Sequence, residues 1–322
     1  MTSLSAGEIS LPALSELLSG YDGALVRVYR DKLAAKAGKA AKTSSKASIP
    51  REKEEEIEDR VKQFVELDSW RYTSLPAILR ERAVGSEDVE KKTNKKKKHG
   101  EEKSAHGFVK KDEMVQLMDW KLKHGSFRPA LMSLVRSNAE AQVESISKEA
   151  FSSLAEDSQA GVFPEAAMQS LCKSFRGVGP ATASLILSLA PEASTPFFSD
   201  ELYYWLCMDL YSRDKQIPKH KLPKLKYNNK EYQDLWDAFT KLRRRIEQLS
   251  EESETKQTFS VQDIEKIAFV IGHLEPTAVG VNSNETSKST PDPKPLSEDV
   301  DIDVEPKKEQ GRRTRKRRRM DI

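Results

Sequence analysis

The sequence predicts an all-α protein, a helical bundle interrupted by a disordered insert and followed by a disordered C-terminal tail. Apolar residues recur at helical spacing between about Pro50 and Glu275, and no stretch alternates apolar and polar residues as a strand does. Residues 83–107 and 276–322 contain no Phe, Trp or Tyr and are rich in charged and small polar residues. Such segments bury too little apolar surface to offset the chain entropy that folding would cost.

The first helices follow from apolar stripes, taken in chain order. Residues 34–48 are small and polar and predict a linker. Helical spacing begins at Pro50, and Pro164 fits the first turn of a later helix. Five helices up to Phe175 are predicted by the following faces: Ile57, Val61, Phe64 and Val65; Met114, Val115, Met118 and Leu122; Pro129, Leu131, Leu134 and Val135; Val143, Ile146, Ala150 and Leu154; Ala167, Met168, Leu171, Cys172 and Phe175.

Four further helices complete the predicted core. Pro180 begins a helix that extends to about Leu189, and Ser199 or Asp200 caps the next one. Ser260 and Asp263 have the spacing of a capping box. The inward faces of the last three helices are Leu202, Tyr203, Leu206, Cys207 and Leu210; Tyr232, Leu235, Trp236, Phe239, Leu242, Ile246 and Leu249; and Ile264, Ile267, Ala268 and Ile271.

These elements divide the chain into five predicted segments. An N-terminal helix with a flexible linker covers residues 1–49, and a helical segment that packs on the core covers 50–82. A disordered basic insert covers 83–107. The all-α core covers 108–275, and a disordered tail with a basic cluster covers 276–322.

Composition limits the classes of function. The net charge of +3 is uneven, because residues 108–275 carry 22 Lys and Arg against 24 Asp and Glu, a net of −2. Cys172 and Cys207 are too few for a disulfide framework or a four-cysteine metal site, and no metal or other cofactor is expected. The N-terminus lacks the features of a signal peptide, and no apolar run approaches the roughly 20 residues that cross a membrane. The sequence predicts a soluble intracellular protein.

The stretch FRGVGPATASLIL, residues 175–187, predicts a tight turn followed directly by an apolar helix. Glycine adopts positive φ at little cost, and we expect both Gly177 and Gly179 to do so. Pro180 suits the first turn of the helix. The turn then presents backbone N–H groups at a helix N-terminus, which is an arrangement that binds phosphate. Backbone donors would hold DNA without reading its bases.

This stretch resembles the helix-hairpin-helix of the DNA glycosylase superfamily, whose pattern is approximately L-P-G-V-G-x-x-T-A. The pattern is matched by Gly177, Val178, Gly179, Thr182 and Ala183, while Phe175-Arg176 replaces Leu-Pro. The superfamily has an aspartate 22 or 23 residues after the first hairpin glycine, and Asp200 follows Gly177 by 23 residues. The resemblance covers residues 110–275 by architecture and 175–206 by motif.

The resemblance implies a role for Asp200 and also shows departures. In the superfamily this carboxylate stabilises the oxocarbenium-like sugar and helps to activate water while the flipped base leaves. The simpler interpretation is that Asp200 only caps a helix, which is worth about 1 kcal/mol. The lysine of the members that act as lyases is replaced by Ala181, so a Schiff-base reaction is not expected. The cysteine cluster and the glutamine-rich probing segment of some members are also missing.

The predicted DNA contacts fall into two groups. The phosphate donors are the backbone of Gly177, Val178, Gly179, Ala181 and Thr182, and the candidate side-chain contacts are Arg176, Lys221, Lys224 and Lys226. A solvated loop explains the three lysines equally well.

A second aromatic and basic stretch, residues 120–129, stands at a predicted helix end. It offers a contact to DNA, although a helix ended by Gly125 with a structural Trp120 is the favoured interpretation. His124 is predicted to be a helix-end residue rather than a ligand.

The tail carries the signals for localisation and regulation. Its basic cluster predicts a nuclear protein that binds an import receptor, with added non-specific DNA affinity as the second interpretation. The acidic run at residues 300–304 offers a strand to a regulatory partner. The cluster comprises Arg312, Arg313, Arg315, Lys316, Arg317, Arg318 and Arg319.

Three classes of function remain open from the sequence. The first is a nuclear DNA-binding protein that uses a glycosylase-like fold to hold the phosphate backbone of duplex DNA. The second is a monofunctional DNA glycosylase that excises a damaged or mismatched base with Asp200. The third is a helical scaffold or chromatin-associated interaction protein. Only the second requires a pocket beside Asp200.

Overall fold

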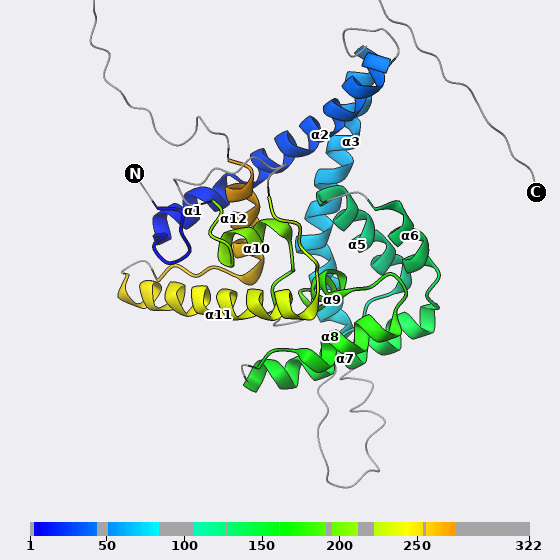
Figure 1. Cartoon of the computed structure of the whole chain (residues 1–322). Coiled ribbons are helices and arrows are strands. Elements are labelled where there is room, and N and C mark those ends of the chain that lie inside the picture. The colour runs from blue at the N-terminus through cyan, green and yellow to red at the C-terminus, as the bar shows by residue number, and fades with distance from the viewer. Residues whose placement is uncertain are drawn as a thin grey trace, which may run out of the picture. The chain divides into compact units, whose positions relative to one another are not determined.

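The computed structural model describes residues 3–43, 51–83, 106–125, 128–160, 162–190, 195–211, 222–253 and 256–274. Every regular element in these ranges is helical, so the predicted all-α class is confirmed (Figure 1). None of these helices is long and apolar enough to cross a membrane. All of them belong to one compact unit, residues 1–280. The predicted tail and all but the edges of the predicted insert lie outside the described residues.

The N-terminal segment is part of the core. Helices α1 (Leu11–Ser19) and α2 (Tyr21–Thr43) bury Leu14 and Tyr21, and the indole N–H of Trp205 donates to the Leu4 carbonyl oxygen at 2.7 Å. The predicted linker at 34–48 is wrong as far as Thr43, because α2 continues through it. Alanine and lysine are strong helix formers, so this small polar stretch favours a helix.

Helix α3 (Arg51–Ser69) leads into a π-helical turn, η1 (Trp70–Ser74), and a further helix over residues 75–83. The stripe predicted for α3 is buried except for Val65, which is 36% exposed. The π-turn places Arg71 in the core with no exposed surface. Its Nη2 atom donates to Glu265 at 3.1 Å and to the Ser188 hydroxyl at 2.9 Å, so η1 is tied to the C-terminal helices.

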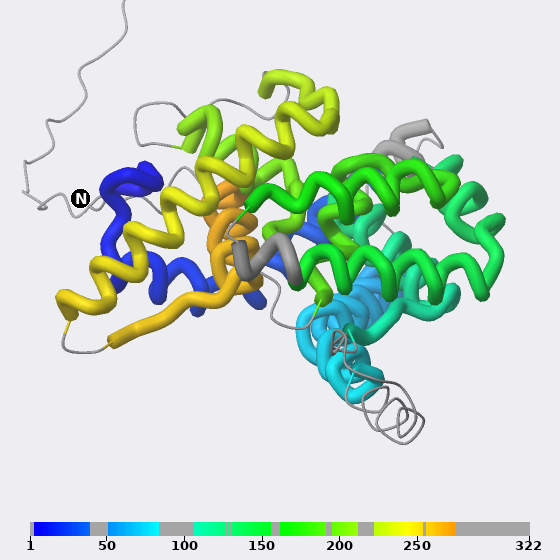
Figure 2. Tube along the Cα trace, turned by 90° about the horizontal axis from the view of Figure 1, so that it is seen from below, coloured from blue at the N-terminus to red at the C-terminus, as the bar shows by residue number. Residues whose placement is uncertain are grey.

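The next four helices lie together on one side of the unit (Figure 2). They are α5 (Lys111–His124), α6 (Pro129–Arg136), α7 (Glu140–Ala160) and α8 (Glu165–Ser174). Helix α7 packs along α8, and α6 packs on α5. Pro164 is the N-cap of α8 rather than a residue of its first turn.

Helix α9 (Pro180–Leu187) is buried on all sides from Ala181 to Leu187, which explains why it carries no charged residue and only two small polar ones, Thr182 and Ser184. It ends two residues before the predicted Leu189. The remaining helices are α10 (Asp200–Leu206), α11 (Asn229–Glu252) and α12 (Val261–Gly272), and α10 packs against α12. The capping box of Ser260 and Asp263 at the start of α12 is confirmed.

Candidate functional site

The hairpin between α8 and α9 needs glycine at only one of its two glycine positions. Gly177 has φ +78°, and a Cβ atom there would lie 2.8 Å from Leu134 Cβ and 3.2 Å from the Leu131 carbonyl oxygen. Gly179 is the N-cap of α9 with φ −113° and ψ −176°, and no atom lies within 4 Å of the position of its Cβ. The expectation of positive φ at both glycines is therefore wrong for Gly179.

Asn138, just before α7, holds the hairpin in place through the backbone of Arg176. Its side-chain oxygen accepts from the Arg176 N–H at 2.9 Å, and its amide donates to the Arg176 carbonyl oxygen at 3.1 Å. The same amide donates to the Val135 carbonyl oxygen at 2.9 Å. Asn138 is 3% exposed, so this contact fixes the turn against α6.

The hairpin leaves several backbone donors unused. Within the described residues, the N–H groups of Gly177, Gly179 and Ala181 make no hydrogen bond. Thr182 differs, since its N–H donates to the Gly179 carbonyl oxygen at 2.8 Å and its hydroxyl accepts from Lys121. The side chain of Val178 is buried in the core. The Val178 N–H likewise makes no hydrogen bond within these residues, so among the predicted phosphate donors only the N–H of Thr182 is already engaged.

A buried extended segment, residues 195–199, carries the chain to Asp200. The Phe197 N–H donates to Glu265 at 2.8 Å, and the Phe198 N–H donates to the Ser184 hydroxyl at 3.0 Å. Ser199 is the N-cap of α10, and its hydroxyl accepts from the Leu202 N–H at 3.2 Å. Of the two predicted caps Ser199 is therefore confirmed, while the interpretation of Asp200 as the cap is wrong and its carboxylate remains available for another contact.

That contact is with Tyr227. The phenol donates to Asp200 Oδ1 at 2.6 Å, and burial together with this carboxylate raises the pKa of Tyr227, which keeps the phenol a donor. Tyr227 has φ +53°, a conformation that is uncommon for a residue with a side chain. Its N–H and that of Lys226 both donate to the Glu231 carboxylate, at 2.7 and 2.9 Å. The start of α11 therefore orients the phenol toward Asp200.

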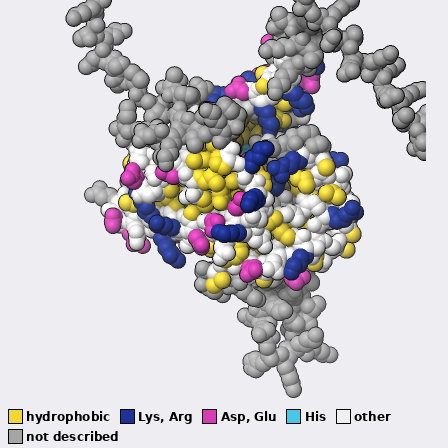
Figure 3. All heavy atoms as spheres, in the orientation of Figure 1, with side chains coloured by type: hydrophobic (Ala, Val, Ile, Leu, Met, Phe, Trp, Pro, Cys, Tyr) yellow, Lys and Arg dark blue, Asp and Glu magenta, His cyan; other side chains and the backbone are white. Residues whose placement is uncertain are grey.

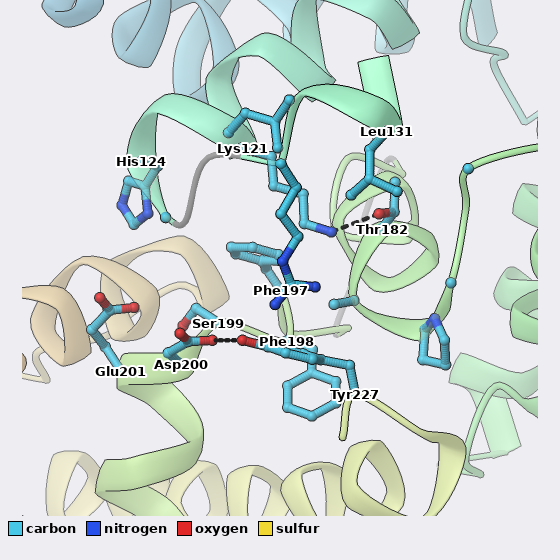
Figure 4. A pocket seen from close by; sticks show the side chains of 17 residues that line it. Lys121, His124, Leu131, Thr182, Phe197, Phe198, Ser199, Asp200, Glu201 and Tyr227 are labelled. Atoms are coloured by element: carbon cyan, nitrogen blue, oxygen red, sulfur yellow. Dashed lines mark hydrogen bonds between the residues drawn. The ribbon is translucent and has the colours of Figure 1, made fainter. Parts of the chain in front are cut away.

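Asp200 and the hairpin line the same cavity, which has a volume of about 200 Å³. Figure 4 shows Lys121 entering it from α5, Thr182 from α9 and Asp200 from α10. The walls are mainly apolar and aromatic, with a few polar groups that converge, as in most ligand sites. The lining residues used below are Lys121, His124, Arg128, Phe197, Phe198 and Tyr227.

Lys121 is a half-buried cation without a carboxylate partner in the described chain. Its Nζ atom donates to Thr182 Oγ1 at 2.6 Å, and the structure gives it no ion pair within these residues. Burial, assisted by the Arg128 guanidinium, lowers the pKa of Lys121 to about 8, while Asp200 and Cys172 act in the opposite direction. A buried ammonium is costly unless it is paired, so the site raises the fraction of neutral amine, although the ammonium form still predominates at pH 7.

His124, the last residue of α5, is a neutral group at the cavity wall. Burial lowers the pKa of His124 to about 3, with His273 and Arg71 adding to the effect. Its ring stacks on Trp120 at 4.7 Å, and Nε2 is buried without a hydrogen-bond partner. His124 is a helix-end residue, as expected, and it also lines the cavity.

The other candidates are more dispersed. Arg176, Lys224 and Lys226 are exposed, and Lys221 and the C-terminal basic cluster lie outside the described residues. The structural role of Trp120 is confirmed, since it is fully buried and its indole donates to Asp68 at 2.8 Å. On the face in Figure 3, basic and acidic side chains are interspersed, in line with the near-neutral charge of the core. In the part of the chain that the structure describes, no three His, Cys, Asp or Glu side chains are arranged to hold a metal ion.

Sequence reasoning missed Asn138 and Tyr227. Lys121 and Arg128 stand in the aromatic and basic stretch at 120–129, but their place in one cavity with Asp200 was not predicted. The guanidinium of Arg128 lies 5.2 Å from the centre of the Tyr227 ring, although the two residues are about a hundred positions apart in the chain. No local pattern marks such pairs. Searches of protein-family models, of curated proteins and of solved structures find no match to this chain.

Proposed function

We propose that this protein binds duplex DNA through the hairpin and excises a base in the adjoining cavity, with Asp200 as the catalytic carboxylate. One observation carries the proposal: the hairpin glycines and Asp200 line a single cavity. The phosphate would be bound by the N–H groups of Gly177, Gly179 and Ala181 at the N-terminus of α9. Arg176, exposed beside the turn, would add charge to this contact.

The size and walls of the cavity suit a base that has left the DNA stack. A cavity of about 150 Å³ holds benzene, so the roughly 200 Å³ here has room for a larger aromatic ring. Phe197 and Phe198 supply aromatic walls, and flipped bases are commonly stacked between such side chains. The unpartnered His124 Nε2 offers a polar contact at the edge of the ring.

Asp200 has the environment that this chemistry needs. Positive charge develops on the sugar as the bond to the base breaks, and a fixed carboxylate stabilises that charge. The Tyr227 phenol orients the carboxylate, which then also serves to direct a water molecule to the sugar carbon. Lys121 and Arg128 supply positive charge for a base that leaves as an anion.

The second candidate function is DNA binding without catalysis. It is favoured by the Tyr227–Asp200 hydrogen bond, which ties the segment before α11 to α10 and gives Asp200 a structural role. A helical scaffold that does not bind DNA is the third. The net charge of −2 over residues 108–275 implies that, for either DNA-binding function, much of the affinity comes from the basic insert and tail.

One experiment separates these functions. The full-length protein, Asp200→Asn and the control Asp237→Asn, an exposed carboxylate on α11, are incubated with duplexes that carry uracil, alkylated, oxidised or mismatched bases. Alkali then reveals abasic sites. Excision by the parent and the control but not by Asp200→Asn supports the proposal. If the protein binds the duplexes but excises no base, non-catalytic DNA binding is supported. If it does not bind them, the helical scaffold is supported.

We also propose that the protein is nuclear, on the basis of the basic cluster at residues 312–319. An import receptor would bind this cluster, and the acidic run before it would bind a regulatory partner. Deleting residues 306–322 should move a fluorescent fusion out of the nucleus. Nuclear accumulation of the truncated fusion would contradict the localisation.

A further inference from the structure

We propose that Lys121 is an amine nucleophile that forms an imine with the ring-opened sugar of an abasic site held in the cavity. The inference rests on the proposed function, because base excision generates that aldehyde. It also reverses the expectation from the sequence, which excluded a Schiff-base step on the grounds that Ala181 occupies the hairpin position. The amine is supplied by a different helix, α5.

Lys121 is placed beside both the hairpin and Asp200. Lys121 and Asp200 line the same cavity, and Figure 4 shows them entering it from different helices, α5 and α10. Lys121 Nζ lies 2.6 Å from Thr182 Oγ1, at the first turn of α9. A sugar whose phosphate is bound by Gly177 and Gly179 would therefore bring its C1′ carbon to the region of this amine.

The surroundings of Lys121 favour a nucleophilic amine over an ordinary ammonium group. An amine attacks a carbonyl only in its neutral form, and lysines used for this chemistry are desolvated or placed near another cation. Lys121 meets both conditions, since it is half buried and lies near the Arg128 guanidinium. With a pKa of about 8, about a tenth of the amine is neutral at pH 7, against well under a thousandth for an ordinary lysine.

The contacts of Lys121 also distinguish it from a structural cation. Lys123, two residues further on, donates to Asp119 at 2.8 Å in an ordinary ion pair within the helix. Lys121 bonds only a neutral hydroxyl in the described part of the chain. A hydroxyl gives up such a bond at small cost, so the amine can turn toward a bound aldehyde.

The reaction balances without a further reagent. The nitrogen lone pair attacks C1′, and the resulting carbinolamine loses its oxygen as water to leave a protonated imine. This cation makes the C2′ hydrogens acidic. Loss of one of them to water breaks the bond between C3′ and its phosphate oxygen, and the phosphate leaves with the bonding electrons. Strand cleavage at the abasic site is therefore a consequence of the imine.

The test uses the full-length protein and a duplex that already contains one abasic site, so it does not depend on base excision. Borohydride reduces an imine to a stable amine, and the covalent adduct is separated on a denaturing gel. The variants are Lys121→Arg, which keeps the charge, and the matched control Lys123→Arg. Peptide mapping of the wild-type adduct identifies the lysine without relying on any variant.

We expect an adduct at Lys121 in the wild type, an equal yield in Lys123→Arg and at least a tenfold loss in Lys121→Arg. An adduct mapped to another amine, or an undiminished yield in a folded Lys121→Arg protein, would overturn the proposal. If the protein binds the duplex but forms no adduct, the proposal is also overturned, while the DNA-binding function stands. If the protein does not bind the duplex, both the proposed function and this inference are overturned.

Discussion

Alanine at Gly177 should destabilise this protein strongly, whereas alanine at Gly179 should not, although the two glycines stand two residues apart in one turn. Gly177 has φ +78° and faces α6, while Gly179 has an extended backbone and open space at the position of its Cβ. The pair therefore tests the structure of the hairpin at single-residue resolution.

The magnitude follows from two costs at Gly177. A residue with a Cβ atom in the left-handed region costs about 1–2 kcal/mol. The new methyl would lie 2.8 Å from Leu134 Cβ and 3.2 Å from the Leu131 carbonyl oxygen, and overpacking of this kind costs about 1–3 kcal/mol. The expected loss is about 2–5 kcal/mol. At Gly179 neither cost applies, and the remaining cost is that alanine is a poorer N-cap than glycine, so the expected loss is at most about 1 kcal/mol.

Urea unfolding, followed by far-UV circular dichroism, measures the stability of both variants and of the parent. The slope of unfolding free energy against urea concentration should be the same in all three proteins. Gly179→Val extends the test to function, since its side chain would cover the N–H groups without straining the backbone. It should keep its stability and lose duplex affinity. The structural reasoning fails if Gly177→Ala is as stable as the parent, or if Gly179→Ala loses as much as Gly177→Ala.

Three further changes test the site. Tyr227→Phe removes the hydrogen bond to Asp200 and should lower the excision rate about tenfold, while duplex affinity stays constant and stability falls by about 1 kcal/mol. Glu265→Ala leaves Arg71 buried and unpaired and should cost about 3–5 kcal/mol in urea unfolding. Lys121→Met should raise stability by about 1–2 kcal/mol near pH 7, because a half-buried cation is removed. The pKa of Lys121 is lower in the folded state than in the unfolded state, so the wild-type protein becomes more stable as the pH rises from about 8 to 10.5. The stability advantage of Lys121→Met over the wild type therefore disappears across that range. Melting temperatures of the two proteins measured at each pH will show this.

Each of these has an outcome that contradicts it. Equal excision by Tyr227→Phe would show that the phenol does not position the carboxylate. A loss below about 1 kcal/mol in Glu265→Ala would mean that water reaches Arg71. A stability difference for Lys121→Met that stays constant from pH 7 to pH 10 would show that Lys121 titrates like an exposed lysine.

Much of the local structure follows from the sequence because short-range rules decide it. The apolar stripes place α5, α7, α8, α11 and α12, and the capping box starts α12 where it was expected. Pro180 begins α9. These features depend on residues within four positions of one another, and the chain encodes them without reference to its other parts.

Local rules also gave wrong results where two of them competed. Residues 34–43 read as a linker by composition, but alanine and lysine favour the helix that α2 forms. Ser199 and Asp200 are both good caps, and Ser199 is the one used because the extended segment before it is fixed by distant partners. Gly179 looked equivalent to Gly177, and only the packing of α6 distinguishes them.

The sequence by itself therefore determined the helices, the hairpin and the spacing of Asp200 from it. The tertiary structure alone decided which side chains meet Asp200 and the hairpin: Lys121 from α5, and Tyr227 from the segment before α11. The pKa of Lys121 also belongs to the tertiary structure, because it arises from burial and from charges on other elements. Contacts between residues tens of positions apart depend on how helices pack, and packing is a property of the whole core rather than of any segment.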